Sequence, residues 1–128
     1  MVQFSGSRPL LVDDEAAIVQ IAKEFLQGLG YRVTAFTSGP RALAEFQAQP
    51  QAFDLLITDL TMPLLTGLDL AEAALKLRPD LLVLLTTGYN EANISAKAQE
   101  IGILQCLLKP LVLRQLGWTV RRQLDRKA

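Results

Sequence analysis

Four apolar runs in the sequence each end in residues whose side chains can take part in chemistry. The run at 9–14 ends in Asp13 and Asp14, and the run at 52–59 ends in Asp59. The run at 81–88 ends in Thr86 and Thr87 before Gly88, and the run at 103–110 ends in Lys109 before Pro110. Carboxylates brought close together repel one another unless a cation joins them, and oxygen ligands without His or Cys suit Mg²⁺. A lysine beside them suits an incoming phosphoryl group, and a carboxylate can be the nucleophile in phosphoryl transfer. If the runs meet, these residues predict a magnesium-assisted phosphoryl-transfer site.

The segments between the runs have the spacing that helices require. The expected helices are 16–30, 38–49, 67–79, 91–102 and 111–128, and a further strand is expected at 31–36. In the first helix, the residues predicted to share one apolar face are Ile18, Ile21, Ala22, Phe25, Leu26 and Leu29. Five strand–helix units in a row predict an α/β fold with a parallel sheet and helices on both faces. Because ligands bind at the carboxyl edge of such a sheet, the polar run ends are expected to converge there.

Composition limits the class of protein further. The chain has 128 residues, 50% of them hydrophobic, which suits a single domain with a substantial core. Thirteen basic residues balance thirteen acidic ones, so nothing indicates a nucleic-acid or anionic-membrane partner. The apolar runs are too short to span a bilayer, and the single Cys fits a reducing compartment, so we expect a cytoplasmic location. The absence of His excludes histidine catalysis and a phosphohistidine within this chain.

Four motifs together resemble the response-regulator receiver domain family. They are "LLVDDE", "ITDLTMPLLTG", "LLTTGY" and "LLKP", in the family's order and at fitting intervals. The resemblance covers nearly the whole chain and implies a receiver domain at 8–128 after a flexible lead-in at 1–7. The implied fold is flavodoxin-like and doubly wound, a five-stranded parallel sheet in the order 2-1-3-4-5.

The resemblance also implies a role for each site residue. Asp59 would be the phosphoacceptor, taking a phosphoryl group from a partner's phosphohistidine. Asp14 would bind Mg²⁺ directly together with Asp59, Asp13 would assist through the metal's water shell, and the Thr61 carbonyl would complete the protein's ligands. Lys109 would contact the phosphoryl oxygens, and Thr87, chosen over Thr86 because Gly88 follows it, would move to bind them.

The residues around this set carry further expectations. Pro63 and Gly67 would shape the loop after the phosphoacceptor, and Lys109–Pro110 is a candidate for a cis peptide bond. Tyr89 and Thr61 would influence how long an acyl phosphate survives. The family usually has an aromatic residue where this chain has Cys106, so the usual conformational switch is expected to be weaker here or to use another residue.

Three other functions share some of these features. A flavodoxin-like cofactor binder has the same architecture, but two acids in the first loop repel a cofactor phosphate. A phosphohydrolase of the haloacid-dehalogenase type wants a second Asp where this chain has Thr61. An inactive pseudo-receiver usually lacks part of the set that is complete here. We therefore expect a receiver that is not an enzyme beyond self-phosphorylation from a donor and slow self-dephosphorylation.

The expected partner is a histidine kinase or a phosphotransfer domain that carries the phosphohistidine. The chain could be a stand-alone receiver or the terminal receiver of a hybrid histidine kinase. Trp118 lies off the apolar stripe of the last helix and is expected to be partly exposed. It could contact a second copy or an output partner on the face made by the last two helices and the last strand.

Overall fold

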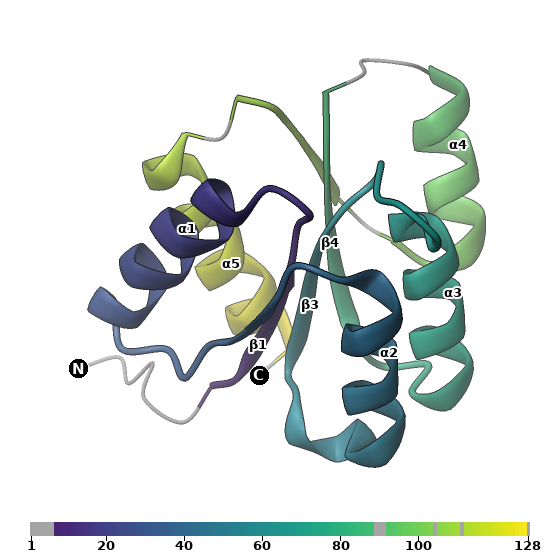
Figure 1. Ribbon diagram of the computed structural model, residues 1–128, viewed down its shortest axis with the longest axis horizontal. Coiled ribbons are helices and arrows are strands. Elements are labelled where there is room, and N and C mark those ends of the chain that lie inside the picture. The colour runs from purple at the N-terminus through teal and green to yellow at the C-terminus, as the bar shows by residue number, and fades with distance from the viewer. Residues whose placement is uncertain (1–6, 89–91, 104, 111, 128) are drawn as a thin grey trace.

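The computed structural model describes residues 7–88, 92–103, 105–110 and 112–127, and Figure 1 shows their arrangement. The strands are β1 (Pro9–Val12), β2 (Thr34–Phe36), β3 (Leu55–Asp59), β4 (Leu82–Thr87) and β5 (Gln105–Leu108). The helices are α1 (Ala16–Gly28), α2 (Gly39–Ala48), α3 (Gly67–Leu77), α4 (Ala92–Ile101) and α5 (Leu113–Lys127), with a short 3₁₀ turn at Pro50–Ala52. In the described part of the chain, every helix is too short or too polar to pass through a lipid bilayer.

The five strands form one parallel sheet in the order β2-β1-β3-β4-β5, as predicted. Helices α1 and α5 cover one face, and α2, α3 and α4 cover the other (Figure 1). The polypeptide therefore forms the flavodoxin-like, doubly wound sheet that the alternation of strands and helices indicates. The order reverses between β1 and β3, which places a crevice at the carboxyl ends of these two strands.

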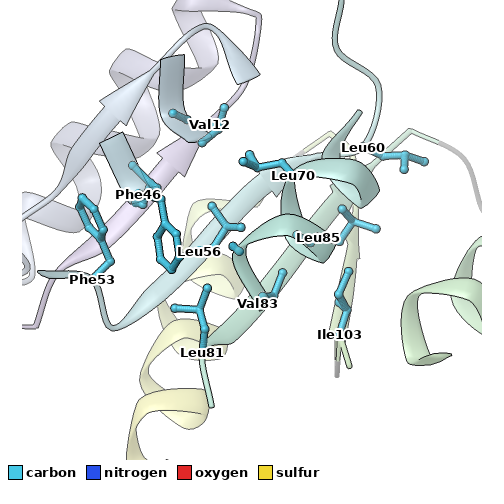
Figure 2. Close-up of a cluster of buried hydrophobic side chains, with 14 of the residues drawn as sticks. Val12, Phe46, Phe53, Leu56, Leu60, Leu70, Leu81, Val83, Leu85 and Ile103 are labelled. Carbon is cyan, nitrogen blue, oxygen red and sulfur yellow. The ribbon is translucent and has the colours of Figure 1, made fainter. Parts of the chain in front are cut away.

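A separate hydrophobic core fills each side of the sheet. On the side of α2, α3 and α4, side chains such as Leu56 and Leu85 pack against Phe46 and Leu70 (Figure 2). On the side of α1 and α5, Ile57 and Leu84 belong to the other cluster. Successive strand residues point to opposite faces, so strands covered on both sides are apolar without interruption. This explains why β1 and β3 are buried along their whole length.

The buried stripe of α1 differs from the predicted one. Val19, Ala22 and Leu26 are buried, whereas Ile21 is 54% exposed and Leu29 is 41% exposed. Successive helix residues lie about 100° apart around the axis, so Ile21 falls at the edge of the stripe that Ala22 centres. Leu29 follows the last helical residue, where the chain turns away. The predicted apolar face of α1 is therefore buried only in part, because Ile21 lies outside the buried stripe and Leu29, beside Gly117 of α5, is partly exposed.

Two strands begin three residues later than the sequence predicts. The strand expected at 31–36 pairs with β1 only from Thr34, where Thr34 is opposite Leu10. The strand expected at 52–59 begins at Leu55, because the Pro50–Ala52 turn occupies the chain before it. Neither change affects the carboxyl ends of the strands, where the polar residues lie.

Candidate functional site

The parallel sheet brings the predicted carboxylates to one edge. Asp13 directly follows β1, and Asp59 is the last residue of β3, the strand beside it. Both side chains are buried, with whole-residue exposures of 2% and 5%, whereas Asp14 is exposed. One carboxylate oxygen from each of the three lies within 4.8 Å of the others. The prediction that these three acids lie close together at one edge of the sheet is confirmed.

Lys109 lies at the centre of the cluster. Its Nζ is 2.9 Å from Oδ2 of Asp13 and 3.3 Å from Oδ2 of Asp59, so one ammonium group joins two buried carboxylates. The residue follows β5, and its backbone N–H donates a 2.8 Å hydrogen bond to the carbonyl of Thr87. The Lys109–Pro110 peptide bond is cis, as predicted.

The cluster changes the proton affinity of Asp59 and Lys109. Burial, followed by the charge of Asp13, raises the pKa of Asp59 from its ordinary value of 3.8 to about 6, although Lys109 acts in the opposite direction. For Lys109, burial lowers the pKa, but the hydrogen bonds and charges of Asp13 and Asp59 outweigh it, and the pKa is raised. The lysine is therefore a permanent cation, while the carboxylates carry more negative charge than it can balance.

The donor set fits a divalent cation. The three acids supply hard oxygen ligands with no His or Cys among them, which is the chemistry that Mg²⁺ prefers. The pKa of Asp59 is raised first by burial and then by the charge of Asp13, and a bound cation would offset both effects by stabilising the ionised carboxylate. Asp14, Asp59 and the exposed Thr61 line a common cavity of about 480 Å³, so a metal ion held there would be open to solvent and to an incoming group.

The predicted hydroxyl residue lies on the neighbouring strand. Thr87 ends β4 and is only 3% exposed, and Thr86, which pairs with Asp59 across the sheet, is 2% exposed. Because side chains alternate along a strand, Thr87 shares a sheet face with Leu85, which pairs with Cys106. Cys106 is half-buried, and burial raises the pKa of its thiol, which keeps it a neutral packing group. The choice of Thr87 over Thr86 stays a prediction. Tyr89 lies outside the described residues.

Sequence reasoning missed Glu15. Its Oε1 lies 3.3 Å from Nζ of Lys109, and its backbone N–H donates a 2.9 Å hydrogen bond to Oδ1 of Asp13. The side chain is 61% exposed and lines the cavity, so it adds a negative charge at the mouth of the site. In the sequence, an acid that follows two others at the start of a helix looks like an ordinary solvent-exposed residue of the first turn. The contact with Lys109, which lies far along the chain, becomes visible only in the folded structure.

The comparisons with known proteins agree on one family. A family model described as "Response regulator receiver domain" matches residues 10–121. The chain is 32% identical over 117 residues to the response regulator receiver protein CpdR of Brucella abortus, covering 91% of this chain and 96% of that protein. It is 36% identical over 122 residues to the DNA-binding transcriptional regulator NtrC of Azospirillum brasilense, covering 95% of this chain but only 25% of that protein.

The solved structures support the same grouping. A CheY-like response regulator receiver domain protein from Methanospirillum hungatei superposes with a TM-score of 0.89 at 31% identity, covering 96% of this chain and 97% of that one. The family match, the order of the strands and the acidic edge of the sheet all indicate a receiver domain. The chain belongs to the response regulator receiver domain family.

Proposed function

We propose that Asp59 is the residue that receives the phosphoryl group in this receiver domain. The observation that supports this most directly is the position of Lys109, whose ammonium lies 3.3 Å from the Asp59 carboxylate at the mouth of an open cavity. A phosphoryl group on Asp59 would place its oxygens within reach of that cation. Receiver domains are regulatory modules rather than enzymes, so the relevant chemistry is a single transfer onto the protein itself.

The transfer forms one bond to phosphorus and breaks another. A carboxylate oxygen of ionised Asp59 attacks the phosphorus of a phosphohistidine, the phosphorus–nitrogen bond breaks, and the imidazole leaves and takes up a proton. Lys109 stabilises the negative charge that spreads over the phosphoryl oxygens. The pKa of Asp59, raised to about 6, still leaves the carboxylate ionised near pH 7.5. The chain contains no His, so the donor is a histidine on another domain or protein.

Asp13, Asp14, Asp59 and the carbonyl of Thr61 are the groups that would hold Mg²⁺. The ion supplies positive charge that offsets the repulsion between the carboxylates and the incoming phosphoryl group. Asp13 and Asp59 both contact Lys109, so two cations would share the buried carboxylates.

The phosphorylated state has to differ in shape to carry a signal. We propose that Thr87 responds to the phosphoryl group, and that the change reaches the surface of α4, β5 and α5. Leu108 of β5 is 48% exposed there, and Val112, which directly precedes α5, is 57% exposed. Histidine kinases or phosphotransfer proteins are the partners of receiver domains. Since these donors draw on ATP inside the cell, we place the chain in the cytoplasm.

Intact-mass measurement after incubation with a small acyl-phosphate donor tests the assignment. With Mg²⁺ the chain is expected to gain the mass of one phosphoryl group, and Asp59→Asn or removal of Mg²⁺ should abolish the gain. A single adduct that persists in Asp59→Asn would overturn the assignment of Asp59.

A further inference from the structure

An apolar groove lies between α1 and α5, apart from the acidic site. It has a volume of about 250 Å³ and is lined by Phe25, Leu29, Tyr31, Arg114, Gly117, Trp118 and Arg121. Leu29 is 41% exposed and Trp118 is 59% exposed, so the apolar wall is open to solvent. Both helices belong to the layer opposite α2, α3 and α4 (Figure 1). The phosphoryl-transfer chemistry uses none of these residues.

Gly117 creates the hollow. A Cβ at this position would lie 2.9 Å from Cε2 of Phe25 and 3.0 Å from Cδ1 of Leu29, so any side chain would fill the groove or separate the helices. Glycine inside a helix is less favourable than alanine. Here the small residue lets α5 pack closely on α1 and leaves the space beside Trp118 open.

Arginines surround the apolar wall. Arg114 and Arg121 line the groove, and the guanidinium of Arg122 lies 4.7 Å from the centre of the Trp118 ring, in a cation–π contact. The described acid on this part of α5 is Asp125, which pairs with Arg121 at 3.7 Å. Three arginines against one aspartate leave this stretch of α5, which forms one side of the groove, positively charged.

We propose that this groove is a docking site for an amphipathic helix of a partner protein, one that presents two apolar side chains four residues apart and acidic residues beside them. The volume is below the range of about 300–1,000 Å³ typical of small-molecule pockets but suits inserted side chains. Exposed Trp and Arg are the residue types that dominate binding energy at interfaces. Acidic flanking residues would match the arginine rim.

A second copy of the chain fits the groove less well. A symmetric dimer brings the same surface together from both subunits, so Arg114, Arg121 and Arg122 would face their own counterparts. The repulsion between these like charges disfavours that arrangement. The proposal is independent of phosphorylation, because the groove uses neither Asp59 nor any residue that contacts Lys109.

Trp118 is the chain's single tryptophan, so its fluorescence reports directly on the groove. The probe is a helical peptide of about 16 residues with two leucines four apart and glutamates beside them; its twin has lysines in place of the glutamates. The acidic peptide should shift Trp118 emission, and the double substitution Arg114→Glu with Arg121→Glu should weaken its binding at least tenfold. Arg41→Glu with Lys76→Glu, a matched charge reversal on α2 and α3, should leave binding unchanged.

Four results would overturn the proposal. The first is an unchanged Trp118 emission at high peptide concentration, and the second is that the lysine twin binds as tightly as the acidic peptide. The third is that the variant with Arg114→Glu and Arg121→Glu binds the acidic peptide as tightly as the unsubstituted chain does. The fourth is a dimer of the chain whose formation requires Trp118. Urea unfolding of each variant, followed by circular dichroism, establishes that a lost signal reflects the groove rather than the fold. Repeating the titration with Asp59→Asn should give the same affinity, which separates this proposal from the one on phosphoryl transfer.

Discussion

Gly67, the first residue of α3, lies directly against the backbone of Asp59. A Cβ at Gly67 would be 2.2 Å from the carbonyl oxygen of Asp59, far inside any permitted contact. The N–H of Gly67 also donates a 2.8 Å hydrogen bond to the carbonyl of Leu60. The start of α3 is thus held against the end of β3, which fixes the backbone that carries the proposed phosphoacceptor.

Gly67→Ala should therefore destabilise the protein and disturb the site. The methyl group has to push two backbone segments apart, and we expect the free energy of unfolding to fall by about 1–3 kcal/mol. Urea unfolding measures the loss. Gly28→Ala is the matched control, because a Cβ at Gly28 meets nothing within 4 Å, and it should raise the free energy of unfolding by about 0.5–1 kcal/mol. Equal effects of the two substitutions would contradict the packing argument.

Asp59→Asn should stabilise the metal-free protein at high pH only. Burial raises the pKa of Asp59 to about 6, so the folded state binds a proton more tightly than the unfolded state does. The stability that this group contributes is greatest at low pH and falls as the pH rises from about 4 to 6. Ionising a carboxyl group whose pKa is raised from 3.8 to about 6 costs the folded state at most about 3 kcal/mol, and screening by solvent reduces the expected gain in Asp59→Asn to about 2 kcal/mol at pH 8 in EDTA.

Urea unfolding at pH 4 and pH 8 tests this dependence. At pH 4 the Asp59→Asn variant and the unsubstituted protein should have similar free energies of unfolding. Asp125→Asn, an exposed substitution on α5, should change the free energy little at either pH. A stabilisation by Asp59→Asn that is equal at both pH values would rule out the ionised carboxylate as its cause.

Lys109→Ala should slow phosphorylation of Asp59 by about 100-fold or more, because the developing charge on the phosphoryl oxygens loses its cation. The carboxylates that would bind Mg²⁺ remain, so calorimetric titration should still detect metal binding. Without Lys109, the metal-free pKa of Asp59 should rise above its present value of about 6. Lys97→Ala, an exposed substitution on α4, is the control for loss of positive charge. A normal rate in Lys109→Ala would remove Lys109 from the chemistry.

Glu15→Gln should speed phosphorylation by small anionic donors about two- to fivefold at low salt. The exposed Glu15 carboxylate competes for Lys109 and repels an anion that enters the cavity. Exposed ion pairs contribute about 0–1 kcal/mol and are screened by salt, so the effect should shrink at high ionic strength. Glu45→Gln on α2 should not change the rate. A slower Glu15→Gln protein would indicate instead that Glu15 holds Lys109 in its productive position.

Thr87→Ala should permit phosphorylation but reduce the conformational response. Thr87 is buried at the end of β4, and its carbonyl binds the N–H of Lys109, so movement there reaches β5 directly. Amide hydrogen exchange of β5 and α5, with and without a phosphoryl mimic such as beryllofluoride, measures the response. Cys106→Ala should leave the response unchanged if the thiol only packs. An unaltered response in Thr87→Ala would assign the switch to another residue.

The architecture, and the sheet edge at which the polar residues meet, follow from the amino-acid sequence alone. Apolar runs alternate with helical spacing, and a parallel sheet aligns the ends of its strands, so the pattern of the chain is enough to place Asp13, Asp59 and Lys109 together. Residue type then limits the chemistry, because three acids and a lysine without histidine suit a hard cation and a phosphoryl group. The hydrophobic pattern and the residue types are properties of short segments, so they can be recognised in the sequence without knowledge of the tertiary structure.

Contacts between segments far apart in the chain are set only by tertiary packing. The pairing of Glu15 with Lys109 and the contact of Gly67 with Asp59 depend on how strands and helices pack. The exposure of Leu29 depends on where α1 ends, and the groove beside Trp118 on how closely Gly117 lets α5 approach α1. Periodicity gives the direction of a side chain relative to its own helix, but not the distance to the neighbouring one, which the packing of both helices sets.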